Sequence, residues 1–100
     1  MSGSLPTTQA EASVLLQHAA GLHARPAVTL TKLAKTFASK VQIAASEGGP
    51  WIDAKSVVKV MGMKTPGNTQ IFIRADGSDA PAAVAALVRL VVDDFTGGPA

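Results

Sequence analysis

Short apolar segments with a two-residue repeat are interleaved along this chain with longer segments that have a helical repeat. Alternation of apolar and polar side chains is typical of half-buried strands, whereas apolar side chains at i, i+3, i+4 and i+7 are typical of amphipathic helices. The first pattern predicts strands over residues 13–17, 41–45, 51–53 and 71–75. The second predicts helices over residues 26–37 and 56–63, and from Pro81 to shortly before Gly97.

This order, strand–helix–strand–strand–helix–strand–helix, predicts an α+β fold in which helices cover one face of a four-stranded sheet. Only a turn, residues 47–50, separates the second and third strands, so these two are expected to form an antiparallel hairpin. A chain of 100 residues with 47% apolar residues is enough for one domain. Its ends are rich in Ser, Gly, Pro and Thr. We therefore expect flexible tails over residues 1–11 and 97–100, and a domain over residues 12–96.

The composition excludes several classes of protein. The chain contains no cysteine, which excludes disulfide scaffolds, thiolate metal sites and cysteine nucleophiles. No apolar run approaches the roughly 20 residues that a membrane-spanning helix needs. The first residues lack the basic start and apolar stretch of a secretory signal, so the cytoplasm is the expected compartment. His18 and His23 lie five residues apart without an acidic cluster, so no metal site is expected.

The charges are unevenly distributed along the chain. The net charge is +2, yet residues 24–64 hold seven basic and two acidic residues and so carry +5. Residues 65–100 carry −2. A basic first half is typical of a protein with an anionic partner, which could be an acidic protein surface, a phosphate or a nucleic acid. A solvated basic face without a partner explains the charge equally well.

The segment GLHARPA, residues 21–27, lies where the first strand gives way to the first helix. Pro26 suits the first turn of a helix, which places His23 at the helix N-terminus. The first backbone N–H groups of a helix have no intrahelical partner and can bind an anion such as a phosphate. Ala24 has no side chain that could cap them, and Arg25 adds a fork of donors suited to phosphate oxygens. A neutral imidazole in this setting can act as a phosphoryl acceptor.

GLHARPA followed by an amphipathic helix, and AKSVVKV about thirty residues later, resembles the HPr family of phosphocarrier proteins of the bacterial phosphoenolpyruvate-dependent sugar phosphotransferase system. The resemblance covers roughly residues 12–96. It implies an open-faced β-sandwich with the order βαββαβα, in which a four-stranded antiparallel sheet carries three helices on one side. It also implies that Nδ1 of His23 accepts a phosphoryl group from enzyme I and passes it to enzyme II A domains, and that Arg25 stabilises this group.

The resemblance further implies a regulatory site and a docking surface. Ser56 stands at the position that a serine kinase modifies in many members of the family. The partner-binding residues would be Ala24, Val57, Val58 and Met61. No cofactor is implied, and the protein would be a monomeric carrier rather than an enzyme, although in fused proteins it would form part of a transferase. Membrane insertion and nucleic-acid binding are not expected of the family.

Three features of this chain depart from the family pattern. Lys64 stands where the family usually has a glycine at the end of the second helix, Ala20 replaces a polar residue of several members, and the hairpin SEGGPWIDA is longer and more apolar than is typical. Two other functions remain open from the residues alone. One is a regulatory binding module that acts through Ser56, and the other is a small nucleic-acid-binding domain, which would show steeply salt-dependent binding.

Overall fold

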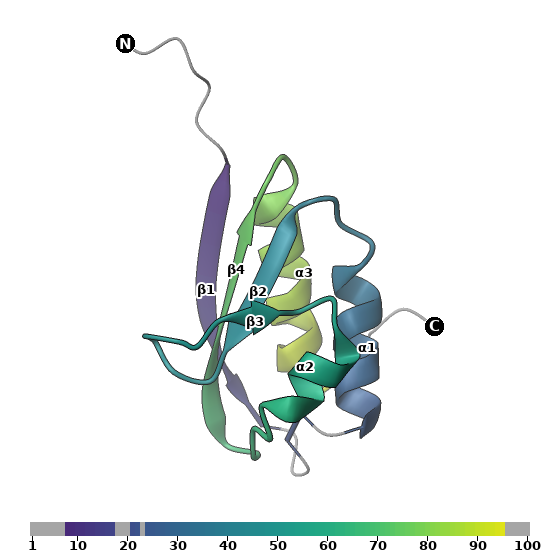
Figure 1. Cartoon of the computed structure of the whole chain (residues 1–100), viewed down its shortest axis with the longest axis vertical. Coiled ribbons are helices and arrows are strands. Elements are labelled where there is room, and N and C mark those ends of the chain that lie inside the picture. Colours follow the sequence, from purple (N-terminus) through teal and green to yellow (C-terminus); the bar gives the residue numbers. More distant parts are fainter. Residues whose placement is uncertain (1–7, 18–20, 23, 96–100) are drawn as a thin grey trace, which may run out of the picture.

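The computed structural model describes residues 8–17, 21–22 and 24–95. The elements follow the order β1 (Gln9–Leu16), α1 (Ala24–Ala34), β2 (Lys40–Ala44), β3 (Ile52–Asp53), α2 (Val57–Gly62), β4 (Thr69–Asp76) and α3 (Ala80–Val92). All strand pairs are antiparallel, and the order across the sheet is β1-β4-β2-β3. The helices lie together on one side of the sheet (Figure 1), so the predicted α+β open-faced sandwich is confirmed.

The core fills the space between this side of the sheet and the helices. Inward-facing residues of β1, β2 and β4 alternate with exposed or half-buried ones, as the two-residue repeat predicted. α3 packs over β1 and β4, and α1 contacts both α2 and α3. The largest fully buried side chains come from the sheet, from all three helices and from the segment before α1: Leu16, Leu22, Leu30, Val41, Ile43, Val60, Ile71, Ile73, Leu87 and Val91.

The first strand begins earlier than predicted. β1 starts at Gln9 rather than at residue 13, because it pairs with β4 along its whole length, from Gln9 opposite Asp76 onward. Ala10 and Ala12 also pack against the core. Residues 9–11 therefore belong to the sheet, and the tail predicted over residues 1–11 is too long. Residues 97–100, the other predicted tail, lie outside the described residues.

The first helix also begins earlier than predicted, and it ends earlier as well. α1 spans Ala24–Ala34 rather than residues 26–37. Beyond Ala34 the chain turns more tightly, since the amides of Thr36 and Phe37 donate to carbonyls three residues back, at 3.0 and 3.2 Å. Phe37 still packs against the core. Its apolar side chain fits the helical repeat although its backbone lies outside the helix.

Asp79 joins two connections that are far apart in the sequence. Its carboxylate accepts hydrogen bonds from the backbone amides of Ala38 (2.8 Å) and Ser39 (2.9 Å) and from the hydroxyl of Ser39. These bonds lower the pKa of Asp79 below its ordinary value of 3.8, and the bond from the Ser39 hydroxyl has the largest effect. Asp79 thereby holds the α1–β2 connection against the start of α3.

Trp51 lies on the side of the sheet that the helices leave open. The Cζ atom of Arg74 lies 4.0 Å from the centroid of the Trp51 ring, and Arg74 Nε donates to Oε1 of Gln42 at 2.9 Å. A guanidinium over an indole face is an attractive cation–π arrangement. Trp51 thus packs the β2–β3 hairpin onto β4.

None of the helices in the described part of the chain is long and apolar enough to cross a membrane.

Candidate functional site

The GLHARPA segment runs from the core into the first turn of α1. Leu22 is fully buried, and α1 begins two residues later at Ala24. Ala24 is therefore a helical residue, not the residue that precedes the helix as predicted. Pro26 lies in the first turn, as expected, and is buried. His23 lies between these fixed neighbours but outside the described residues, as does His18.

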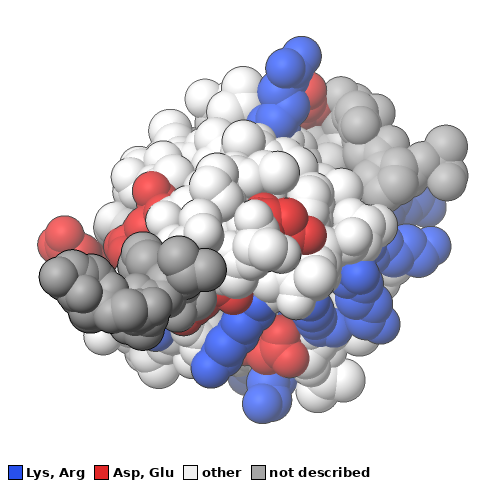
Figure 2. All heavy atoms as spheres, turned by 90° about the horizontal axis from the view of Figure 1, so that it is seen from above, with Lys and Arg blue, Asp and Glu red and all other residues white. Residues whose placement is uncertain are grey.

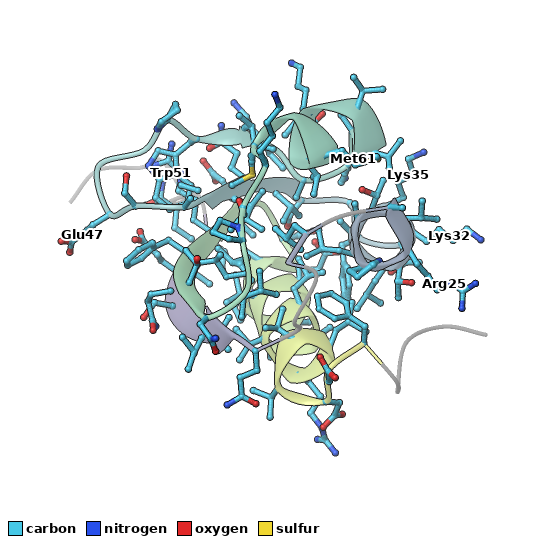
Figure 3. The ribbon with its side chains drawn as sticks, turned by 90° about the horizontal axis from the view of Figure 1, so that it is seen from below. Arg25, Lys32, Lys35, Glu47, Trp51 and Met61 are labelled. Atoms are coloured by element: carbon cyan, nitrogen blue, oxygen red, sulfur yellow. The ribbon has the colours of Figure 1, made fainter. Side chains whose placement is uncertain are left out.

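Arg25 is exposed in the first turn of α1, and this turn contains no acidic residue. The hydroxyl of Thr29 donates to the carbonyl of Arg25 at 3.0 Å. This bond uses the backbone of Arg25 and not its guanidinium group. Figure 3 shows Arg25, Lys32 and Lys35 on the outer side of α1, pointing away from the core. A helix start favours negative charge. The first turn of α1 and Arg25 can therefore both attract an anionic group.

Seen from above, basic side chains gather mainly along one side of the molecule (Figure 2). Lys32, Lys35 and Lys40 are all exposed, as are Lys59 and Lys64. The single salt bridge among the described residues joins Arg89 of α3 to Asp93, the residue that follows the helix. The basic residues of α1 and α2 are thus available to an acidic partner.

Ser56 immediately precedes α2 and caps it. Its backbone is extended, and its hydroxyl accepts a hydrogen bond from the amide of Lys59 at 3.3 Å. The residue is half-buried, so its hydroxyl is not sealed inside the core. The structure therefore supplies a structural reason for a serine at this position.

The predicted docking residues differ in exposure. Val58 is 77% exposed and Met61 is 37% exposed, both on α2, whereas Val57 is half-buried and packs against the core. Val28 of α1 is also exposed, at 40%. Because α1 contacts α2, the apolar surface of α2 adjoins the helix that begins at the GLHARPA segment. Val58 and Met61 are therefore more exposed there than Val57.

Lys64 adopts the conformation that the glycine of the family pattern would favour. Its φ is +52°, in the left-handed region, and its amide donates to the carbonyl of Met61 at 3.1 Å. The turn that follows α2 therefore contains a left-handed residue, although that residue carries a side chain. The turn after α2 is therefore formed even though Lys64 replaces the usual glycine.

Sequence reasoning missed the contact that anchors the GLHARPA segment. The amide of Leu22 donates to the carbonyl of Thr65 at 3.0 Å, just beyond α2. Gly21 is buried, with a φ of +70°. In the sequence, Gly21 is one glycine among several. Its left-handed φ and its closeness to Thr65 are seen only in the folded chain. Within the described part of the chain, no cluster of three or more His, Asp or Glu residues could hold a metal ion.

Comparison with known proteins agrees with this arrangement. Residues 10–93 match the family model "PTS HPr component phosphorylation site". The chain is 39% identical over 84 residues to the phosphocarrier protein HPr of Mycoplasma capricolum, which covers 84% of this chain and 92% of that protein. It is 38% identical over 77 residues to the multiphosphoryl transfer protein of Vibrio cholerae, which covers 76% of this chain but 19% of that protein.

A solved histidine-containing phosphocarrier protein from Mycoplasma superposes on this fold with a TM-score of 0.78, at 38% identity. The superposition covers 86% of this chain and 96% of that one. The region that matches the family model, residues 10–93, contains all seven elements of the fold except the first residue of β1. The chain belongs to the HPr family of the phosphotransferase system.

Proposed function

We propose that this protein carries phosphoryl groups in the sugar phosphotransferase system, with His23 as the transient acceptor. Enzyme I would be the donor and enzyme II A domains the acceptors. The observation that supports this most strongly is the position of GLHARPA, which enters the first turn of α1 in a chain of the HPr family. The protein would act as a carrier rather than as an enzyme, because each cycle needs both a donor and an acceptor protein. It would do so as a monomer in the cytoplasm.

The transfer would be a displacement at phosphorus. Nδ1 of the neutral His23 imidazole forms a bond to the phosphorus atom, and the bond between phosphorus and the donor's phosphorylated group breaks. Phosphoryl transfer depends mainly on positioning and on charge stabilisation. The incoming negative charge would lie at the start of the eleven-residue helix α1, where the helix dipole and the exposed Arg25 both favour it.

Partner docking would use the apolar surface of α2 together with the basic residues beside it. Val58 and Met61 supply the apolar part, and Lys59 lies between them in the sequence. Interfaces often combine a small apolar centre with charge complementarity at the rim, which speeds encounter. A partner with an apolar anchor surrounded by carboxylates fits this surface, and Ala24, exposed at the start of α1, would lie at its edge.

Regulation at Ser56 is a second proposed function of the same surface. The hydroxyl is half-buried at the start of α2, next to the exposed Val58 side of the helix. A phosphate added there by a serine kinase would bring roughly two negative charges to the docking surface. It would repel an acidic partner while suiting the helix start. Nucleic-acid binding has less support, because the ring of Trp51 is already occupied by Arg74.

The experiment compares Arg25→Ala with Arg89→Ala, a matched loss of an exposed arginine on another helix. Each variant is incubated with phosphoenolpyruvate and enzyme I, and the phosphorylated fraction is followed over time. Loss of one charge-assisted contact, about 1.5–3 kcal/mol, should slow transfer roughly ten- to a hundredfold in Arg25→Ala. Arg89→Ala should transfer at the wild-type rate. Equal rates in both variants would refute the role of Arg25.

A further inference from the structure

The segment that precedes His23 is held by the chain beyond α2, about forty residues away in the sequence. The amide of Leu22 donates to the carbonyl of Thr65 at 3.0 Å. A Cβ atom on Gly21 would lie 2.0 Å from that same carbonyl oxygen and 2.9 Å from the carbonyl carbon of Pro66. Only a residue without a side chain allows the two backbones to approach so closely.

We call Lys64–Thr65–Pro66 the clasp. It is itself fixed at both ends. Lys64 closes α2 in a left-handed conformation, and just beyond the clasp the amide of Asn68 donates to the carbonyl of Leu16, at 2.6 Å, at the end of β1. The Thr65 side chain is only 3% exposed. The clasp is therefore tied to α2 and to the sheet, so it is a rigid support for Leu22.

Pro66 adds a restriction of its own. A proline disfavours the helical conformation of the residue before it and keeps that residue extended. Pro66 thus restricts the backbone conformation of Thr65 even without the contact to Leu22. The Thr65 carbonyl therefore loses little conformational freedom when it accepts the hydrogen bond from Leu22. Pro66 itself is exposed, so it contributes to the clasp mainly through the backbone.

We propose that Thr65 is a positioning residue for the phosphoryl acceptor, acting through its backbone carbonyl on Leu22. The inference rests on the proposed function of His23 and adds a requirement to it. The hydrogen bond fixes Leu22, and the helix fixes Ala24, so both sequence neighbours of His23 have defined positions. A misplacement of about 1 Å can cost about a hundredfold in the rate of a reaction that depends on positioning.

The first test is Gly21→Ala, with Gly48→Ala as its control, because a Cβ at Gly48 would meet no atom within 4 Å. Phosphorylation by enzyme I is measured as separate kcat and KM values for the carrier. We expect kcat to fall about tenfold or more in Gly21→Ala. KM should stay within about twofold, because Val58 and Met61, which would dock the donor, are unchanged. Gly48→Ala should match the wild type in both.

The second test decides the matter if Gly21→Ala does not fold. Pro66→Gly frees the Thr65 backbone without removing a buried side chain, and Pro81→Gly makes the same change at an exposed proline on α3, far from the clasp in the sequence. We expect kcat to fall several-fold in Pro66→Gly alone, with KM unchanged. In hydrogen exchange, the Leu22 amide should also lose protection in Pro66→Gly but keep it in Pro81→Gly.

The outcomes separate this inference from the proposed function. If the wild-type protein takes up no phosphoryl group from enzyme I, the proposed function is wrong. If the wild type is phosphorylated and the folded clasp variants keep its kcat, the function stands and Thr65 does not position the acceptor. A rise in KM with unchanged kcat would also overturn the inference, because it would assign the clasp to docking.

Discussion

The hydroxyl of Ser56 accepts a hydrogen bond from the backbone amide of Lys59, 3.3 Å away, and so caps α2. A carboxylate can accept the same bond and is favoured at a helix start. We therefore expect Ser56→Asp to keep its free energy of unfolding within about 1 kcal/mol of the wild type, measured by urea denaturation. Ser56→Ala, which loses the cap, should be destabilised by about 1 kcal/mol.

The same Ser56→Asp variant should slow phosphorylation of His23 by enzyme I, since it adds negative charge beside Val58. Ser78→Asp is the matched control, because Ser78 is exposed in the turn between β4 and α3. It should leave the rate unchanged. If Ser56→Asp unfolds the protein, or transfers as fast as Ser78→Asp, the docking surface has been assigned to the wrong helix.

Among the described residues, Val58 is the most exposed of the large apolar side chains, at 77%, and its replacement tests docking without disturbing the core. Val58→Glu should change the free energy of unfolding by no more than about 0.5 kcal/mol. It should raise KM for phosphorylation by enzyme I roughly tenfold, the equivalent of about 1.4 kcal/mol. Val92→Glu, at a 59% exposed position on α3, should leave KM unchanged. Equal effects of the two variants would point to a general effect of charge.

Lys64 carries a conformational cost that a glycine would avoid. Its φ of +52° is unfavourable for a residue with a side chain by about 1–2 kcal/mol, part of which glycine would lose again through its greater freedom when unfolded. Lys64→Gly should therefore raise the free energy of unfolding by about 0.5–1 kcal/mol. Asn68→Gly, at a φ of +59°, should gain less, because asparagine adopts this region more readily. A lower free energy of unfolding in Lys64→Gly would contradict the claim that Lys64 is conformationally strained.

The stability that Asp79 contributes near neutral pH should be lost in acid. Hydrogen bonds from Ser39 and Ala38 lower the pKa of Asp79 in the folded protein below its ordinary value of 3.8. The stabilisation is therefore fully present above that value and is lost as the pH falls through the lower, folded-state pKa. Melting curves of the wild type and Asp79→Asn should differ most near neutral pH and converge in acid. A difference that does not shrink in acid would contradict the linkage, and Asp76→Asn controls for the change in net charge.

The sequence predicted the elements of this fold because each has a local signature. The order of strands and helices follows from their repeats, and Ser56 at the start of α2 follows from the preference of serine for helix caps. The ends of β1 and α1 were misplaced. The start of β1 is set by pairing with β4, and the end of α1 is set by a tight turn that leaves Phe37 in the core. The pairing of β1 is not local in the sequence, and the apolar repeat continues through Phe37 although the helix ends at Ala34.

The residues that hold the site together were harder to predict for the same reason. GLHARPA is a local motif, and a role for Arg25 can be proposed from it. The carbonyl of Thr65 belongs to a backbone group that every residue has, so nothing in its side chain marks it as the partner of Leu22. Asp79 likewise reaches Ser39 across forty positions. Contacts of this kind appear only once the chain is folded.

The central claim is that His23 accepts a phosphoryl group, and the mass of the intact protein after incubation with phosphoenolpyruvate and enzyme I tests it most directly. The wild type should gain the mass of one phosphoryl group, which is lost on acid treatment and kept in base, as expected of a phosphoramidate. His23→Ala should gain nothing. An adduct that survives acid, as a phosphoserine at Ser56 would, or an equal gain of mass in His23→Ala, would contradict the account.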